Sequence, residues 1–353
     1  MKEIQIKIPG KLYVAGEYAV VEKGHSAIIT AVDRFIYLTI CETKNPYGKI
    51  FSKDYTEKPA RWIRNRNRFW LSKQNYRLKY IRSAIHMTER YLYEQGVPLK
   101  LFDLNIHSEL KNSANKKLGL GSSAAITVGT IRALLQFYGR KDSNRLVYKL
   151  AVLAQMNLKM KSSFGDLAAS TYTGWIKYTN FDHPFVLKRF KKMPTKDLVE
   201  MKWPALEIKQ LNVSKELNFL VGWTGRPAST NRLVGNVQKQ KNGNSLKYDE
   251  FLKQSEASVK LLAASLSKKD VQGIKKAIKS NRQALLAMGN QTKVLIETPQ
   301  LKKLIDLAKK HDAVAKTSGA GGGDSGIAFV FNDQKVKALI QDWKKAAISL
   351  LPL

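Results

Sequence analysis

The apolar positions near the start of the chain follow the two-residue period of β-strands. Residues 4–8 alternate isoleucine with polar side chains, which predicts a half-buried strand that ends at Pro9-Gly10. Residues 27–41 are rich in β-branched and aromatic types and predict one or two further strands. The alternation returns at 102–107, so a strand is expected there as well.

Two stretches on either side of that last strand follow helical spacing instead. The first predicts a helix over 78–95, closed by Gly96 and Pro98. The second begins near Ala124 and repeats apolar residues at intervals of three and four, which is the stripe of an amphipathic helix. A loop rich in glycine and serine, residues 108–123, connects the strand to this helix. The sequence therefore predicts a strand–loop–helix unit.

The remainder of the chain separates into strand-like and helical parts. Strands are predicted at 174–182 and 217–223, and mostly helical structure at 229–311. Near the C-terminus, two strand-like runs flank a glycine-rich loop, and a helix follows. We interpret the chain as an α+β protein of two domains, residues 1–205 and 206–353, because a chain of 353 residues is long for one core.

Composition is that of an ordinary globular protein. Apolar residues make up 44% of the chain and charged residues 25%, enough for a sizeable core. No run approaches the roughly 18 apolar residues of a membrane span, and the N-terminus lacks the apolar core of a signal peptide. The single cysteine, Cys41, excludes an internal disulfide and fits a reducing compartment. These features predict a cytoplasmic protein without membrane insertion.

The net charge of +33 is the unusual feature of the composition, and it favours anionic partners. Residues 61–82 contain eight basic, five aromatic and no acidic side chains, a combination that single-stranded nucleic acid binding uses. The basic excess is nevertheless spread along the whole chain, and no recognised nucleic-acid motif accompanies it. Nucleic-acid binding is therefore the non-enzymatic alternative, and a generally cationic surface is the simpler interpretation.

The loop before the second predicted helix has the chemistry of a phosphate site. It reads LGLGSS over Leu118–Ser123, with glycines that let the backbone approach a ligand closely and with two hydroxyl groups. The first turn of a helix presents amide groups without helical acceptors, and the helix macrodipole adds partial positive charge there. No Walker A pattern occurs in the chain. A serine-capped helix start is the structural alternative.

A second glycine cluster, KTSGAGGGDSGIAF, occupies residues 316–329. Gly321, Gly323 and Gly326 satisfy G-x-G-x-x-G, but a strand-like run follows them, whereas the dinucleotide fingerprint opens a helix. The density of glycine indicates backbone that passes close to a ligand or partner. A tight hairpin connection is the alternative.

Two charged residues stand near predicted element ends. Lys11 follows the first strand in PGKLYVAGEYAV, and Asp166 lies within SSFGDLAAS. Asp166 fits an acid–base or orienting role, or else a favourable charge at a helix start with Ser163 as its capping-box partner. A lone lysine is ordinarily solvated surface, so neither residue indicates a site by itself.

Taken in order, the three glycine-bearing segments resemble the motifs of the GHMP kinase superfamily. PGKLYVAGEYAV is similar to its first motif, LGLGSSAA to its second and SGAGGGDSGIAF to its third. The resemblance implies an N-terminal domain like domain 2 of ribosomal protein S5 and a ferredoxin-like C-terminal domain. It also implies that ATP and an acceptor meet between the two domains.

Within the superfamily, the chain most resembles the bacterial phosphomevalonate kinase family. The likeness lies in Lys116-Lys117 before the second motif, in GDLAAS leading into GWIKYTNFD, in FLVGWTGRPAST and in the Gly-Gly-Gly-Asp run. It implies transfer of the ATP γ-phosphoryl group to (R)-5-phosphomevalonate, with Mg²⁺, in the mevalonate route to isoprenoids. Mevalonate kinase, a decarboxylase that acts on the diphosphate, or another small-molecule kinase of the superfamily is the alternative.

The resemblance further implies roles for individual residues. Lys11 would lie against the transferring group and act with Asp166 in catalysis, and Ser123 would contact Mg²⁺. ATP would be bound by Lys117, Leu118, Gly119, Leu120, Gly121, Ser122 and Ser123, and the acceptor by Lys11, Ser318, Gly319, Ala320, Gly321 and Gly322.

Asp166 needs a separate argument. In superfamily members that phosphorylate alcohols, the matching aspartate is the catalytic base. The implied acceptor here is a phosphate monoester, whose second pKa is about 6, so near neutral pH it is already mostly the dianion. We therefore hypothesise that Asp166 orients Lys11 and the acceptor more than it accepts a proton.

Overall fold

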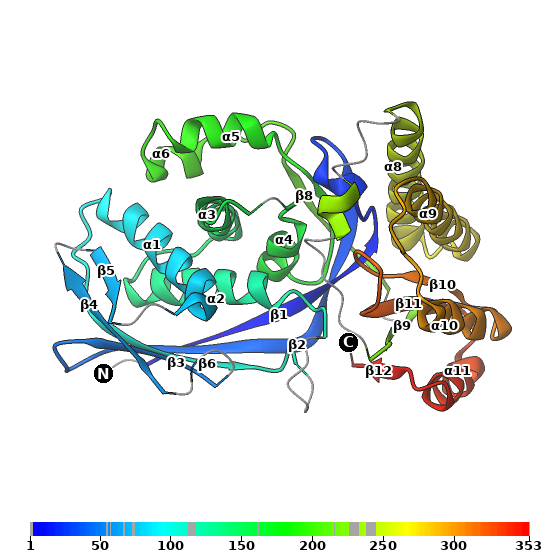
Figure 1. The fold of residues 1–353 in the computed structure, drawn as a ribbon, viewed down its shortest axis with the longest axis horizontal. Helices are drawn as coiled ribbons and strands as arrows, with labels where there is room; N and C mark the ends of the chain where they lie inside the picture. The colour runs from blue at the N-terminus through cyan, green and yellow to red at the C-terminus, as the bar shows by residue number, and fades with distance from the viewer. Residues whose placement is uncertain are drawn as a thin grey trace.

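Two sheets organise the chain (Figure 1). The computed structural model describes residues 3–53, 56, 58–65, 68–72, 75–111, 118–160, 162–214, 216–225, 233–237 and 245–352. Within these residues, no helix is long and apolar enough to cross a membrane.

The first sheet is built from the N-terminal part of the chain. Its eight strands are β1 (Ile4–Ala15), β2 (Ser26–Glu42), β3 (Gly48–Ser52), β4 (Ala60–Asn65), β5 (Arg68–Leu71), β6 (Phe102–Ser108), β7 (Trp175–Thr179) and β8 (Glu207–Leu211). They follow the order β5-β4-β3-β6-β2-β7-β8, and β1 pairs antiparallel along β2. The long antiparallel pair of β1 and β2 therefore crosses the sheet, and the helices described next pack on it.

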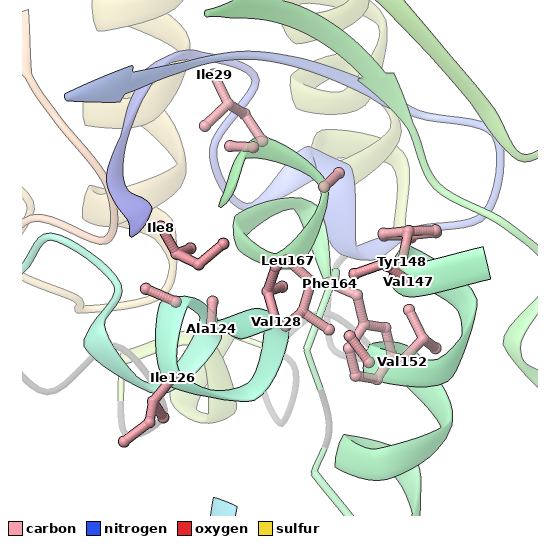
Figure 2. Packing of buried hydrophobic residues seen from close by; sticks show 14 of the residues in the cluster. Ile8, Ile29, Ala124, Ile126, Val128, Val147, Tyr148, Val152, Phe164 and Leu167 are labelled. Atoms are coloured by element: carbon pink, nitrogen blue, oxygen red, sulfur yellow. The ribbon is translucent and has the colours of Figure 1, made fainter. Parts of the chain in front are cut away.

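Helices cover one face of this sheet (Figure 1). Those nearest the sheet are α1 (Lys79–Tyr93), α2 (Ser122–Phe137) and α4 (Gly165–Tyr172), while α3 (Asn144–Asn157), α5 (His183–Phe190) and α6 (Thr195–Glu200) lie farther from it. The core lies where the apolar face of the strands meets these helices. Figure 2 shows Ile8 of β1, Val128 of α2 and Leu167 of α4 in this core, and all three are nearly inaccessible to solvent.

The second sheet belongs to the C-terminal part. It contains β9 (Asn218–Trp223), β10 (Val314–Thr317), β11 (Ser325–Val330) and β12 (Ser349–Leu351) in the order β10-β11-β9-β12, with every pair antiparallel. Helices α8 (Ser245–Lys268), α9 (Val271–Gln291) and α10 (Pro299–Lys310) connect β9 to β10, and α11 (Asp333–Lys345) connects β11 to β12. This βαββαβ order is ferredoxin-like. The α+β prediction with two sheet-based domains is confirmed.

The predicted end of the first strand was wrong, because pairing across the sheet overrides a local turn signal. β1 does not end at Pro9-Gly10, since a register shift there lets the strand continue to Ala15. Residues 27–41, predicted to form one or two strands, form one, which spans Ser26–Glu42. The first sheet extends to Leu211, because β8 pairs with β7, and the second begins at Asn218, while the division of the chain at residues 205 and 206 stays a prediction.

The basic aromatic segment 61–82 contributes to the core as well as to the surface. Trp62 is fully buried, and its ring centroid lies 4.8 Å from that of Phe69 and 4.6 Å from that of Phe102. Arg64 is paired with the buried Glu89. Trp70 remains 55% exposed, so only part of the segment could stack against a nucleic acid base.

Candidate active site

Lys11 lies on β1, against the loop that precedes α2. Its backbone N–H donates to the carbonyl of Leu120 over 3.0 Å, and its Nζ donates to the carbonyl of Gly119 over 3.3 Å. The Lys11 side chain also passes close over Gly121, since a Cβ at that glycine would lie 2.7 Å from Lys11 Cε. The first and second glycine motifs are therefore in direct contact.

The loop enters α2 through glycines in the left-handed region. Gly119 and Gly121 both have φ of +75°, which a residue with a Cβ adopts only with strain. Gly121 is the N-cap of α2, no side chain caps the helix within the described chain, and Ser122 and Ser123 are its first two residues. The serine-capped alternative is therefore wrong, because the serines lie inside the helix.

The backbone N–H groups of this loop indicate that the loop binds a ligand that accepts hydrogen bonds. Among the described residues, no protein acceptor is found for the N–H groups of Gly119, Gly121, Ser122 and Ser123. Unpaired amides at a helix N-terminus favour a bound anion. The side chains of Leu118 and Leu120 are buried, so only their backbone could meet a ligand, and Lys117 lies outside the described residues.

Asp166 occupies the first turn of α4 and is partly exposed. Ser163 is not its capping partner, because Phe164, with φ of +59°, is the N-cap of this helix. The Ser163 hydroxyl instead shares a hydrogen bond of 3.0 Å with the Tyr13 hydroxyl. The start of α4 is thus tied to β1 two residues beyond Lys11.

Asp324 is a site residue that the sequence reasoning missed. Its carboxylate faces the second motif, since a Cβ on Gly119 would lie 2.7 Å from Asp324 Cγ. Its carbonyl accepts from the N–H and the hydroxyl of Thr224, over 2.9 Å and 3.0 Å. The signal was an acidic residue that ends a glycine run, and Asp324 has a φ of +51°, which is uncommon for a residue other than glycine.

The third motif packs against the first, and most of its donors have partners inside the protein. The amide of Ser318 donates to Ser325, that of Gly319 to Glu17 Oε1, and that of Gly322 to Ile296, over 2.9–3.3 Å. The Ser318 hydroxyl donates to the carbonyl of Tyr13 over 2.6 Å.

This packing limits how the third motif could bind the acceptor. Within the described residues, the amides of Ala320, Gly321 and Gly323 are the ones in this loop for which no protein acceptor is found. The binding roles of Ser318, Gly319 and Gly322 remain predictions, and amide donation by these residues would require their present bonds to break.

Three carboxylates surround Lys11 electrostatically. Burial lowers the pKa of Lys11, and the carboxylates of Asp166, Asp324 and Glu17 oppose that shift, Asp166 most strongly. Because burial is the largest influence, Lys11 loses its proton at a lower pH than an exposed lysine does. Both domains thus contribute electrostatic attraction for the ammonium, since Asp324 directly precedes β11 of the C-terminal sheet and Asp166 lies in α4.

Oxygen atoms of the kind that Mg²⁺ prefers are close to this point. Ser123 lies in the first turn of α2, and its side chain partly opposes the rise that burial causes in the pKa of Tyr80. Asp166 and Asp324 supply carboxylates within electrostatic reach of Lys11. Mg²⁺ in phosphoryl-transfer sites binds one or two protein carboxylates together with substrate phosphates and waters. The donor set fits such an ion.

Comparisons with known proteins agree with this geometry. The family models GHMP kinases N terminal domain and GHMP kinases C terminal match residues 79–174 and 262–349. A phosphomevalonate kinase from Streptomyces sp. (strain CL190) is 35% identical, over 98% of this chain and 95% of that protein.

Two solved structures are similar along nearly the whole chain. The Lin0012 protein from Listeria innocua superposes with a TM-score of 0.93 at 37% identity, covering 99% of this chain and 97% of that one. Phosphomevalonate kinase from Streptococcus pneumoniae, in complex with phosphomevalonate and AMPPNP, superposes with a TM-score of 0.87 at 29% identity, covering 99% and 98%. With both family models matched in order and a full-length relative above 30% identity, the chain belongs to the GHMP kinase family.

Proposed function

We propose that this protein is a phosphomevalonate kinase, which transfers the γ-phosphoryl group of ATP to the phosphate of (R)-5-phosphomevalonate and yields 5-diphosphomevalonate and ADP. The observation that carries the proposal is the convergence of Lys11, the loop 118–123 and Asp166 at one point beside the third motif. The full-length similarity to phosphomevalonate kinases supports this choice of acceptor.

The loop 118–123 binds the phosphates of ATP in this proposal. The amides of Gly119, Gly121, Ser122 and Ser123 supply the donors, and the α2 dipole adds partial positive charge. Glycine is favoured at positions 119 and 121 because it adopts the left-handed backbone without strain, and turns of this kind can gather backbone N–H groups around an anion.

Lys11 stabilises the group in transfer. An oxygen of the acceptor phosphate attacks the γ-phosphorus, the bond to the bridging oxygen breaks, and ADP leaves. Two anions must come together, and unit charges about 4 Å apart repel by roughly 4 kcal/mol at an effective dielectric of 20. The Lys11 ammonium, fixed by its bond to the Gly119 carbonyl, offsets part of this repulsion.

Asp166 holds Lys11 in its charged form and in place. Its carboxylate makes the largest opposing contribution to the burial that lowers the pKa of Lys11. The acceptor phosphate needs no base, because its second pKa is about 6. Asp166 is therefore a positioning residue in this reaction.

Mg²⁺ would be held by Ser123 and a carboxylate of this site, Asp166 or Asp324. When bound with ATP, the ion neutralises charge on the nucleotide phosphates. A cytoplasmic location is part of the proposal, because the reaction consumes ATP.

A parallel substrate assay tests the function. ADP release is measured with mevalonate, phosphomevalonate and diphosphomevalonate under identical conditions, and the product is identified by phosphorus NMR. We expect turnover with phosphomevalonate and formation of a diphosphate. Faster turnover of mevalonate would assign the protein to the alternative, mevalonate kinase.

A further inference from the structure

A buried ion pair joins the two domains next to the proposed site. Lys316, in β10, and Glu17, in the turn after β1, are 0% and 3% exposed. Lys316 Nζ lies 2.5 Å from Glu17 Oε1. None of the roles proposed above uses either residue as a binding or reacting group.

The pair is the centre of a set of bonds between the first and third motifs. Lys316 Nζ also donates to the carbonyl of Val14 over 3.2 Å and to that of Thr317 over 2.7 Å. Glu17 Oε1 also accepts the amide of Gly319 over 3.3 Å. The ion pair thus holds the beginning of the glycine loop against the end of the strand that carries Lys11.

Two neutral hydrogen bonds continue this contact. The Ser318 hydroxyl donates to the carbonyl of Tyr13, and the Tyr18 hydroxyl donates to the carbonyl of Ala320, each over 2.6 Å. Residues 13–18 and 316–320 are therefore bonded side by side although about 300 positions separate them in the chain.

Stability alone does not account for the pair. All four residues of β10 are buried. Apolar side chains of similar volume often stabilise a buried site as well as an ion pair does. What an ion pair adds is directional geometry, because Glu17 Oε1 must meet both the ammonium and the Gly319 amide. That geometry fixes the position of the third motif relative to the end of β1.

We propose that Glu17 and Lys316 are positioning residues that fix the distance between the third-motif loop and Lys11, and thereby place the acceptor phosphate for in-line attack. The inference rests on the proposed function, since it assigns the acceptor to the third-motif side. Neither residue touches a substrate in this proposal. Their effect passes through Gly319 and Ala320 on one side and through β1 on the other.

The test uses Glu17→Gln, Lys316→Met and the double variant Glu17→Gln/Lys316→Met in the full-length enzyme. The matched control is Lys335→Met, which breaks an exposed ion pair with Asp312 in the same domain. Thermal unfolding, kcat and the KM values for ATP and for phosphomevalonate are measured for each. Activity of the unaltered enzyme on phosphomevalonate tests the proposed function first. The ratio of the variant's kcat/KM for phosphomevalonate to that of the unaltered enzyme tests this inference.

We expect each single variant to unfold at a lower temperature, because each leaves a buried charge without its opposite charge. The double variant should regain part of that stability, because it leaves neither charge buried without an opposite charge. Its kcat/KM for phosphomevalonate should still be lower by about 100-fold, as expected for a misplacement of about 1 Å, while the KM for ATP changes by less than about twofold. The Lys335→Met control should keep the kcat/KM for phosphomevalonate and the KM for ATP of the unaltered enzyme.

Recovery of both stability and acceptor kcat/KM in the double variant would show that the pair is only structural and would overturn the proposal. Should the Met and Gln variants fail to fold, Glu17→Asp and Lys316→Arg retain the charges but change the reach by about one bond or more. Those variants should show the same acceptor-specific loss. Unchanged acceptor kinetics in them would equally refute the positioning role.

Discussion

Replacing Gly121 by alanine separates the geometry of the site from the stability of the fold. Gly121 has φ of +75°, and an added Cβ would lie 2.7 Å from Lys11 Cε and 2.9 Å from Lys11 Cγ. Carbon atoms prefer separations of about 3.5–4.0 Å, so the Lys11 side chain must move by about 1 Å. Its contact with the Gly119 carbonyl would be lost in that movement.

Two costs follow from this change, and they can be told apart. The left-handed backbone costs about 1–2 kcal/mol in stability for a residue with a Cβ. Displacement of Lys11 by about 1 Å should lower kcat/KM by about 100-fold, which corresponds to about 2.7 kcal/mol of transition-state stabilisation. The first cost would appear in thermal unfolding, and the second in the kinetics.

Gly139→Ala is the matched control. Gly139 follows α2 with φ of +65°, and nothing lies within 4 Å of the Cβ it would gain. We therefore expect both variants to lose similar stability in thermal unfolding. Only Gly121→Ala should lose activity in the coupled ADP-release assay. If the two variants have kcat/KM values within about twofold of each other, the argument that Lys11 acts at the reacting group is wrong.

Further predictions concern protonation and the metal. In Asp166→Asn, the pKa of Lys11 should fall further, because the carboxylate that most strongly opposes the effect of burial is gone. The alkaline limb of the pH–rate profile should therefore shift to lower pH. Loss of the acidic limb instead would indicate that Asp166 is a base. Ser123→Ala should raise the Mg²⁺ concentration for half-maximal rate by about tenfold, equivalent to about 1.4 kcal/mol, whereas an equal effect in Ser122→Ala would contradict the assignment. Burial lowers the pKa of His183 to about 4, so between about pH 6.5 and pH 4 the unfolded chain binds more protons than the folded one and stability falls as pH falls. Chemical unfolding of His183→Phe should show a smaller loss over that range, and an identical loss would refute this explanation.

The sequence was sufficient for features that depend on neighbouring residues. The strand at 102–107 and the helix after Ala124 were predicted correctly, because a buried face imposes its period on every second residue of a strand and on every third or fourth residue of a helix. The three glycine motifs were also visible in sequence, since left-handed backbone and close approach select glycine locally. Their order allowed the family to be identified.

The sequence could not decide features that depend on which distant segments meet. Pro9-Gly10 signals a turn, yet pairing with β2 carries the strand past it, because backbone hydrogen bonds across a sheet outweigh a local preference. Trp62 and Trp70 looked equivalent in a basic aromatic segment, but they point to opposite faces of one hairpin, so one is buried and the other exposed.

The sequence by itself therefore determined the elements, the glycine loops and the family, since these follow from local backbone geometry and periodicity. Tertiary structure alone decided that Lys11, otherwise an unremarkable lysine, lies beside Gly119 and Asp324, and that Lys316 meets Glu17. The physical reason is that a charged side chain acquires its role from the groups that share its buried environment. Those groups come from distant positions, since Gly119 is 108 positions from Lys11 and Lys316 is 299 positions from Glu17, separations that no local pattern encodes.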